Sequence, residues 1–297
     1  MESLRPERSL PGNRDHRLAG LPTADRNPVL DLTEVDPVSV PTEKALRLAI
    51  SGTFGVGKTT TAEAVAIAAG IPRTHALTSR EILRDLVPGK TVQELSATEL
   101  LLLGLRRLEE RIHNEAEIPG SFVSDGSVIH EWVYGEARMR VGINPGARWA
   151  LRTVKAVVGL PYRRFYQSYM DAYGIIVKNR AARLYDAYVH LPVEFEMERD
   201  GHRPVSEPFR LLSDRLLIET LEEIGVPYDI VGGTVAERVA KILELHRLPV
   251  VVPVDEAIEL AGRRVREATD VLERHAREMA ADRDRSLRRR LRYALRY

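Results

Sequence analysis

One stretch of the chain has the residue types and the spacing of a phosphate-binding loop. Residues 51–60 read S-G-T-F-G-V-G-K-T-T, which contains the Walker A pattern G-x-x-x-x-G-K-[ST]. The backbone N–H groups of such a loop can surround phosphate oxygens, and the N-terminus of the helix that follows adds partial positive charge. An apolar run at 45–50 and a helical pattern at 60–69 place a strand before the loop and a helix after it. The stretch predicts a P-loop that binds a nucleoside triphosphate.

The residues of this loop have distinct predicted roles. Lys58 is expected to reach the β- and γ-phosphates, and Thr59 is expected to bind Mg²⁺. The full set expected to surround ATP is Gly52, Thr53, Phe54, Gly55, Val56, Gly57, Lys58, Thr59 and Thr60. Elsewhere no His, Asp or Glu group has a metal-ligand spacing, so the only metal that the sequence implies is Mg²⁺ arriving with ATP.

An acid and several arginines later in the chain have the side chains that phosphoryl transfer requires. Asp125 follows the predicted strand 121–124, where an acid can accept the proton of a substrate hydroxyl or hold Mg²⁺ through water. A helix N-cap is the alternative role for this residue. The polar segment 194–210 is predicted to be a mobile lid whose positive charge stabilises the migrating phosphoryl group. The lid cations are Arg203, with Arg199 and Arg210 as further candidates.

Two more residues are predicted substrate contacts. Arg80 lies at the start of a helix predicted over 78–87, and this end of the helix is expected to face the cleft. A surface ion pair is the alternative role for Arg80. Glu131 follows Asp125 by about one helical turn together with His130, so both side chains are candidates to face the substrate.

The elements that position these residues alternate between strands and helices. Strands are predicted near 46–50, 73–77, 121–124, 186–191 and 228–231. This alternation predicts an α/β fold with a doubly wound, parallel, five-stranded sheet. Ligands of such sheets bind at the carboxyl ends of the strands, where the P-loop, Asp125 and the loop after Leu191 all fall.

The chain of 297 residues divides into three predicted parts. Residues 1–42 are rich in proline without periodicity and are expected to form a disordered or extended tail. Residues 43–248 form the predicted ATP-binding domain. Residues 249–297 form a long, basic, amphipathic helix, whose apolar stripe would pack on the domain or on a partner chain. Its terminal Arg288-Arg289-Arg290 cluster either attracts phosphates or anionic surfaces or is a solvated helix end, which we favour.

The composition narrows the class of protein. A net charge of +1 provides no global attraction to nucleic acid or to a membrane. The chain has no cysteine, which excludes disulfides and thiolate metal sites and agrees with a cytoplasmic location. No apolar run approaches the roughly 20 residues that a membrane span needs. A hydrophobic content of 44% is sufficient for a core.

The residues that accompany the P-loop separate the classes of nucleotide-binding protein. A GTPase needs the motif N-K-x-D, and the chain contains no Asn-Lys pair. ABC-type and AAA-type machines usually end the strand of the acid with Asp-Glu, whereas this chain has Asp125-Gly126. A small-molecule kinase, with an acid on the neighbouring strand, a helical substrate wall and a cationic lid, agrees better with the sequence.

Residues 45–246 resemble the P-loop kinase-like ATPase family that includes the ribosylnicotinamide kinase domain of bacterial NAD-biosynthesis regulators. The resemblance rests on G-T-F-G-V-G-K-T-T, T-S-R-E at 78–81, F-V-S-D-G-S at 122–127, D-G-H-R-P at 200–204 and G-V-P-Y at 225–228. It implies a nucleoside-kinase-like fold and the use of ATP and Mg²⁺. Related kinases often carry an arginine where this chain has Gly126. The candidates to replace that cation are Arg138, Arg140, Arg163 and Arg164.

These observations lead to a first hypothesis and two alternatives. The first is an ATP–Mg²⁺-dependent phosphotransferase that acts on a small hydroxyl-bearing molecule such as a nucleoside. The second is a regulatory NTPase that binds ATP or GTP and whose C-terminal helix engages a partner protein or a second copy of the chain. Phosphorylation of nucleic acid through the C-terminal arginines is the least favoured.

Overall fold

The computed structural model describes residues 45–283, apart from 89, 91, 142–159 and 195–205. Several sequence predictions fall outside the described residues: the tail 1–42, the lid cations Arg199 and Arg203, and the terminal arginine cluster. The side chains of Arg80 and Arg163 are also outside them, although both residues lie in described helices.

The five predicted strands form one parallel sheet, as expected. They are β1 (Arg47–Ser51), β2 (Arg73–Thr74), β3 (Phe122–Asp125), β4 (Ala187–His190) and β5 (Tyr228–Ile230), in the order β2-β3-β1-β4-β5. In the register of the sheet, Ile50 of β1 lies beside Asp125 of β3, and Ser51 lies beside His190 of β4. The P-loop therefore leaves the sheet between two strands that both end in polar residues.

Strand β2 is shorter than predicted, because side chains of a helix capture the backbone after Thr74. Asn114 donates from Nδ2 to the carbonyl oxygen of His75 over 2.8 Å. Arg107 donates from Nη1 to the carbonyl oxygen of Leu77 over 2.7 Å. Carbonyls engaged in this way leave the ladder, so the segment 75–77 turns away from the sheet and leads into α2.

Eight α-helices lie in the described part of the chain, together with a short 3₁₀ turn at Val92–Glu94. They are α1 (Lys58–Ala69), α2 (Ser79–Leu86), α3 (Ala97–Ala116), α4 (Val128–Val141), α6 (Leu160–Leu184), α7 (Glu207–Ile224), α8 (Val235–Leu245) and α9 (Val254–Arg283). Capping boxes start α2, α3 and α8, where the N-cap hydroxyls of Thr78, Ser96 and Thr234 accept the N–H of a glutamate three residues later.

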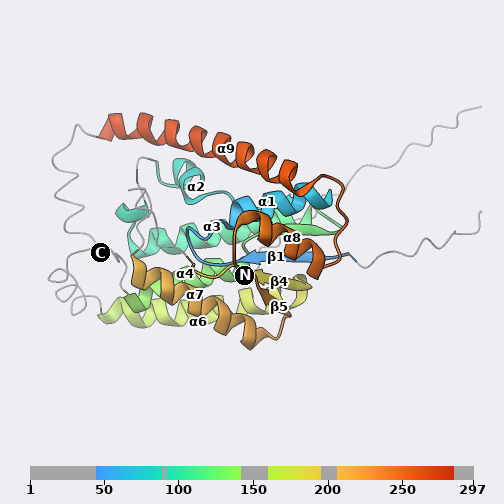
Figure 1. Ribbon diagram of the computed structural model, residues 1–297. Coiled ribbons are helices and arrows are strands. Elements are labelled where there is room, and N and C mark those ends of the chain that lie inside the picture. The colour runs from blue at the N-terminus through green and yellow to red at the C-terminus, as the bar shows by residue number, and fades with distance from the viewer. Residues whose placement is uncertain (1–44, 89, 91, 142–159, 195–205, 284–297) are drawn as a thin grey trace, which may run out of the picture. The chain divides into compact units, whose positions relative to one another are not determined.

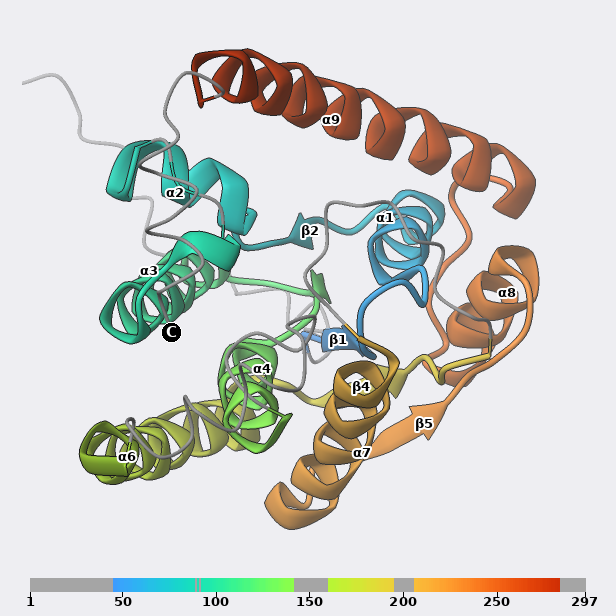
Figure 2. The ribbon, with the colours of Figure 1, turned by 90° about the vertical axis from the view of Figure 1, so that its left-hand side faces the viewer.

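Helices cover both faces of the sheet (Figures 1 and 2). Side chains of the strands point alternately to two hydrophobic layers, one on each face. Leu48 and Ile50 pack in one cluster with α1, α8 and α9. Ala49 and Tyr188 pack in a second cluster with α4, α6 and α7. A smaller cluster joins α2 to the first turns of α3. The arrangement is doubly wound, with helices on both faces, as the sequence predicts.

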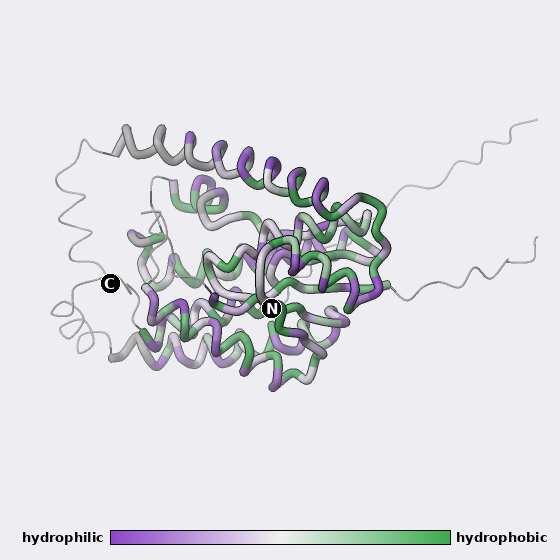
Figure 3. The backbone as a smooth tube through the Cα atoms, in the orientation of Figure 1, coloured by the Kyte–Doolittle hydropathy of each residue, from purple (hydrophilic) through white to green (hydrophobic). Residues whose placement is uncertain are grey.

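Helix α9 packs over the outer side of α1, on the face of the sheet that carries the cluster of Leu48 and Ile50 (Figures 1 and 2). Ala257 and Ala261 of α9 are fully buried against this layer, and most of α1 that faces them is alanine, which allows a close approach. Val251 donates its N–H to the carbonyl of Ala68 over 2.8 Å, which fixes the segment that precedes α9. The strands at the centre are largely hydrophobic, whereas α9 carries many hydrophilic residues (Figure 3). No helix among the described residues is long and apolar enough to cross a membrane.

Candidate functional site

The P-loop joins the end of β1 to the start of α1 in a conformation that requires glycine. Gly52 has a φ of 136°, and a Cβ placed there would lie 2.6 Å from the carbonyl oxygen of Leu191. A side chain at position 52 would therefore collide with the backbone that follows β4. Gly57, with a φ of 87°, is the N-cap of α1. The loop thus passes close to the neighbouring strand before it turns into the helix.

Buried arginines from two other helices hold the backbone of this loop. Arg210 of α7 donates from Nε to the carbonyl of Phe54 over 2.9 Å, and Arg238 of α8 donates from Nη1 to the carbonyl of Val56 over 2.6 Å. In a trans peptide the C=O and the next N–H point in opposite directions. Fixing these two carbonyls therefore orients the N–H groups of Gly55 and Gly57, which are the groups that a P-loop offers to phosphate.

The position of Arg210 differs from the predicted lid. The residue lies within α7, which begins at Glu207, and its side chain is only 1% exposed. Its guanidinium supports the P-loop through Phe54, whereas a lid cation was expected over the phosphates. Arg238 was missed by sequence reasoning. The available signal was its place on the apolar face of the predicted helix 234–246, between Val235 and Ile242.

The residues expected to bind phosphate and Mg²⁺ lie at the start of α1. Lys58 donates from Nζ to the carbonyl of Thr53 over 2.6 Å, and Thr59 is exposed. The buried Oγ1 of Thr53 has no hydrogen-bond partner among the described residues. Hydroxyl and carboxylate oxygens are the ligands that Mg²⁺ prefers, so Thr59 and Asp125 suit a metal that the nucleotide brings. The described residues contain no group of three or more His, Cys, Asp or Glu that could hold a metal ion.

Asp125 lies at the carboxyl end of β3, directly beside β1. Its side chain is 13% exposed, and Oδ2 lies 3.3 Å from Nη1 of Arg73 on β2. The same guanidinium also pairs through Nε with Glu63 of α1. The N–H of Gly126 donates to the carbonyl of Ile50 over 3.0 Å, which ties the end of β3 to the strand that leads into the P-loop. The predicted acid is therefore held beside the start of the phosphate-binding loop.

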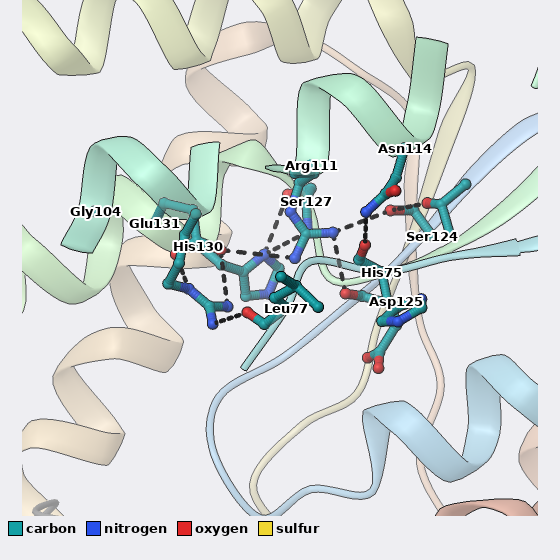
Figure 4. A network of polar contacts seen from close by, with 12 residues as sticks. His75, Leu77, Gly104, Arg111, Asn114, Ser124, Asp125, Ser127, His130 and Glu131 are labelled. Atoms are coloured by element: carbon teal, nitrogen blue, oxygen red, sulfur yellow. Dashed lines mark hydrogen bonds and ion pairs between the residues drawn. The ribbon is translucent and has the colours of Figure 1, made fainter. Parts of the chain in front are cut away.

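A buried guanidinium from α3 occupies the space beside Gly126 (Figure 4). Arg111, 3% exposed, donates from Nη1 to Oγ of Ser124 over 3.3 Å and to the carbonyl of Asp125 over 3.2 Å. Gly126 has a φ of 81°, and a Cβ there would lie 3.3 Å from Nη2 of Arg111. A cation thus approaches Asp125 from α3. Sequence reasoning missed it, because the helix also carries Arg106 and Arg107 nearby and the sequence does not show which arginine reaches β3.

Four other arginines were predicted candidates to replace the cation that related kinases carry at the position of Gly126, and the structure places each of them differently from Arg111. Arg138 lies over the ring of Phe209 at 5.9 Å, beside the aromatic group that Phe54 and Tyr134 form by stacking at 4.3 Å. Burial lowers the pKa of the Arg138 guanidinium. Arg140 pairs with Glu136 on its own helix. Arg164 is exposed, and the side chain of Arg163 lies outside the described residues.

Glu131, a predicted substrate contact, forms a two-point ion pair with Arg107 of α3. Oε2 accepts from Nε over 2.6 Å and Oε1 accepts from Nη2 over 3.0 Å, and Arg111 lies 3.6 Å from Oε1. Burial opposes ionisation of this carboxyl, but the charge and hydrogen bonds of Arg107 lower its pKa. The predicted contact with substrate stays a prediction, and the structure adds a second role in joining α3 to α4.

His130 is buried behind the P-loop with a defined tautomer. Its Nδ1 accepts the N–H of Ser127 over 2.9 Å, so the proton of the neutral ring resides on Nε2. Nε2 is buried. Burial lowers the pKa of His130 well below its usual value, and the charges of Lys58 and Arg111 lower it further. The ring is therefore neutral at neutral pH.

Comparisons with known proteins find one family model and several similar solved structures. A family model described as an AAA domain matches residues 47–238. No curated protein matches the chain. Similar solved structures include deoxyadenosine kinase from M. mycoides with bound dATP (12% identity, 68% of this chain and 100% of that chain, TM-score 0.47). Another is the NadR protein in complex with NR (13% identity, 70% of this chain and 52% of that chain, TM-score 0.41). A third is thymidylate kinase from Candida albicans (14% identity, 69% of this chain and 92% of that chain, TM-score 0.46).

At these identities and TM-scores, the similar structures bear on neither the reaction nor the substrate. The family match covers all five strands. It ends within α8, before α9 begins. It includes the P-loop, Asp125 and both arginines that hold the loop. The chain belongs to this family of AAA domains, built on a P-loop.

Proposed function

We propose that the protein is an ATP–Mg²⁺-dependent phosphotransferase that acts on a small hydroxyl-bearing molecule such as a nucleoside. The observation that carries the proposal is the place of Asp125 at the end of β3, in register with Ile50 of the strand that leads into the P-loop. A carboxylate at this position lies beside the start of the phosphate-binding loop, where an acceptor hydroxyl would have to approach.

Each residue has a proposed part in the reaction. The N–H groups of Gly55 and Gly57, oriented by the arginines behind the loop, bind phosphate oxygens together with Lys58. Thr59 and Asp125 would hold Mg²⁺, which neutralises charge on the phosphates when bound. Asp125 accepts the proton of the acceptor hydroxyl or positions the metal. Arg199 and Arg203 are proposed to stabilise the migrating phosphoryl group from the lid.

A screen for phosphate transfer from labelled ATP to nucleosides, sugars and amino alcohols tests the proposal. Lys58→Ala should abolish productive ATP binding. Asp125→Asn should retain ATP binding but reduce transfer on the order of 10²–10³-fold, since it removes a proton acceptor or metal contact. Unchanged transfer in Asp125→Asn would contradict a kinase. So would ATP turnover that yields only free phosphate with every acceptor tested.

A regulatory NTPase is the second candidate, and the surface of α9 favours it. Beyond the buried Ala261 the helix continues to Arg283, and Val271 is 41% exposed. A helix of this length with an exposed apolar side chain is suited to a partner protein or a second copy. Size-exclusion measurements with ATP and with ADP distinguish the two candidates, because a switch should change its assembly state with the nucleotide.

A further inference from the structure

Four charged side chains form a row of ion pairs that runs from α9 to Asp125. Arg264 of α9 donates from Nη1 to Oε1 of Glu63 over 2.7 Å. The other carboxylate oxygen of Glu63 pairs with Nε of Arg73. Nη1 of Arg73 in turn lies 3.3 Å from Oδ2 of Asp125. The charges alternate in sign along the row, so each inner residue is held from both sides.

Glu63 is the most buried of the four side chains, and Arg264 is the most exposed. The side chain of Arg264 is 63% exposed, whereas those of Arg73, Asp125 and Glu63 are 22%, 13% and 8% exposed. A carboxylate as buried as Glu63 needs compensating partners, because desolvation disfavours its charge. Two arginines satisfy it, one from the sheet and one from the C-terminal helix.

Arg73 depends on its charged partners for its position. It belongs to β2, a strand of two residues at the edge of the sheet, so the backbone restrains it little. Its guanidinium bridges Glu63 and Asp125 and is fixed by both. If Glu63 lost Arg264, its full charge would act on Arg73 and draw the guanidinium away from Asp125.

We infer that Arg264 and Glu63 are positioning residues for Asp125, and that α9 is thereby part of the phosphoryl-transfer site. The inference rests on the proposed function of Asp125. It concerns a helix that begins after the family match ends at residue 238. Figures 1 and 2 show why the contact is available: α9 runs along α1, the helix that carries Glu63.

The charged contact can be separated from the packing of α9. Ala257 and Ala261 are fully buried and attach the helix to the core. Arg264 lies one turn further along the same face and contributes mainly its guanidinium. Arg264 is 63% exposed and Glu63 keeps Arg73 as a partner, so the pair should add little to folding, roughly 0–1 kcal/mol. Removing its charge should therefore change the site more than the stability.

The test compares Arg264→Gln with Arg274→Gln in the full chain. Both variants remove one positive charge from α9, but Arg274 is exposed and donates to the backbone carbonyl of Asp270 on its own helix. Arg264→Gln should lower kcat by roughly two- to fivefold, because an ion pair of this strength can bias the position of a catalytic group only by its own free energy. Its ATP affinity and melting temperature should stay close to those of Arg274→Gln. Arg264→Lys, which keeps the charge, should recover part of the rate.

A double-mutant cycle decides whether the effect passes through Asp125. In an Asp125→Asn background, Arg264→Gln should cause no further loss of the residual rate. A loss that persists in that background, or equal effects of Arg264→Gln and Arg274→Gln, would overturn the inference. The same comparison can use slow ATP hydrolysis without acceptor. Failure to find an acceptor would then contradict the proposed function alone, while the hydrolysis rates still decide the role of Arg264.

Discussion

Nη1 of Arg238 lies 2.6 Å from the carbonyl oxygen of Val56, so helix α8 holds the P-loop from outside the nucleotide site. Nη2 of the same guanidinium lies 2.6 Å from Oε2 of Glu194, whose carboxylate also accepts the N–H of Gly233. The arginine therefore connects three segments: the P-loop, the end of β4 and the turn before α8. The arrangement of the loop depends on this contact across the domain.

Arg238→Met should weaken both the fold and nucleotide binding. It leaves the Val56 carbonyl without its charged donor, so the free energy of unfolding should fall by about 2–4 kcal/mol. ATP affinity should fall by roughly tenfold, since the N–H of Gly57 loses its fixed orientation. Denaturant titration and calorimetric ATP binding measure the two effects. Lys241→Met is the control on the same helix, because that lysine pairs with exposed Glu244 on the surface. Equal losses in both variants would exclude a specific role for Arg238.

Gly126→Ala should be more destabilising than Gly225→Ala. Both glycines have positive φ, 81° and 66°, so alanine at either position incurs a backbone cost of about 1–2 kcal/mol. At Gly225 the added Cβ meets nothing within 4 Å, whereas at Gly126 it lies 3.3 Å from Nη2 of Arg111. The difference between the two variants in denaturant titration therefore reports the contact with Arg111. Identical values would mean that Arg111 moves aside at no cost.

His130 should make stability depend on pH below about 6.5. Its pKa is lowered in the folded protein, so the unfolded chain binds the proton more readily than the folded one. The free energy of unfolding should be constant above the ordinary pKa of about 6.5 and decrease below it, by up to about 1.4 kcal/mol per pH unit from this residue. His75 and His246, whose pKa values are also lowered by burial, should contribute in the same direction.

His130→Asn should remove its part of this slope, whatever it does to the absolute stability. Melting temperatures measured from pH 5 to pH 8 provide the comparison. His113→Asn is the matched control, since the His113 side chain is 68% exposed and pairs only with Glu117. If His130→Asn kept the full slope, the buried neutral ring would not be its source.

Glu131→Gln should be destabilising because it leaves Arg107 buried without a negative partner. The expected loss in the free energy of unfolding is roughly 2–4 kcal/mol, somewhat below that of a fully buried pair. Glu109→Gln should cost less than about 1 kcal/mol, since Glu109 pairs with Arg106 on the surface of the same region. The lowered pKa of Glu131 means that its contribution is present above about pH 4.5 and is lost at lower pH. The free energies of unfolding of the two variants should therefore converge at low pH. A difference that stays constant with pH would contradict the ion pair.

Local patterns allowed much of the fold to be predicted. The P-loop and the parallel strands depend on residues within a few positions of one another. The second strand was predicted too long, because the carbonyls of His75 and Leu77 are captured by Asn114 and Arg107. That competition involves residues 39 and 30 positions away, which no local pattern records.

The sequence by itself determined that the chain has a P-loop at the carboxyl end of a strand in a parallel sheet, with an acid at the end of another strand. Only the tertiary structure decided what surrounds them. Arg238 reaches Val56 across 182 positions, and Arg264 reaches Glu63 across 201. A phosphate-binding loop is specified by glycines that are adjacent in sequence, because the backbone itself forms the site. A buried charge is specified by whichever helix can bring a compensating charge to it, and that depends on packing across the whole domain.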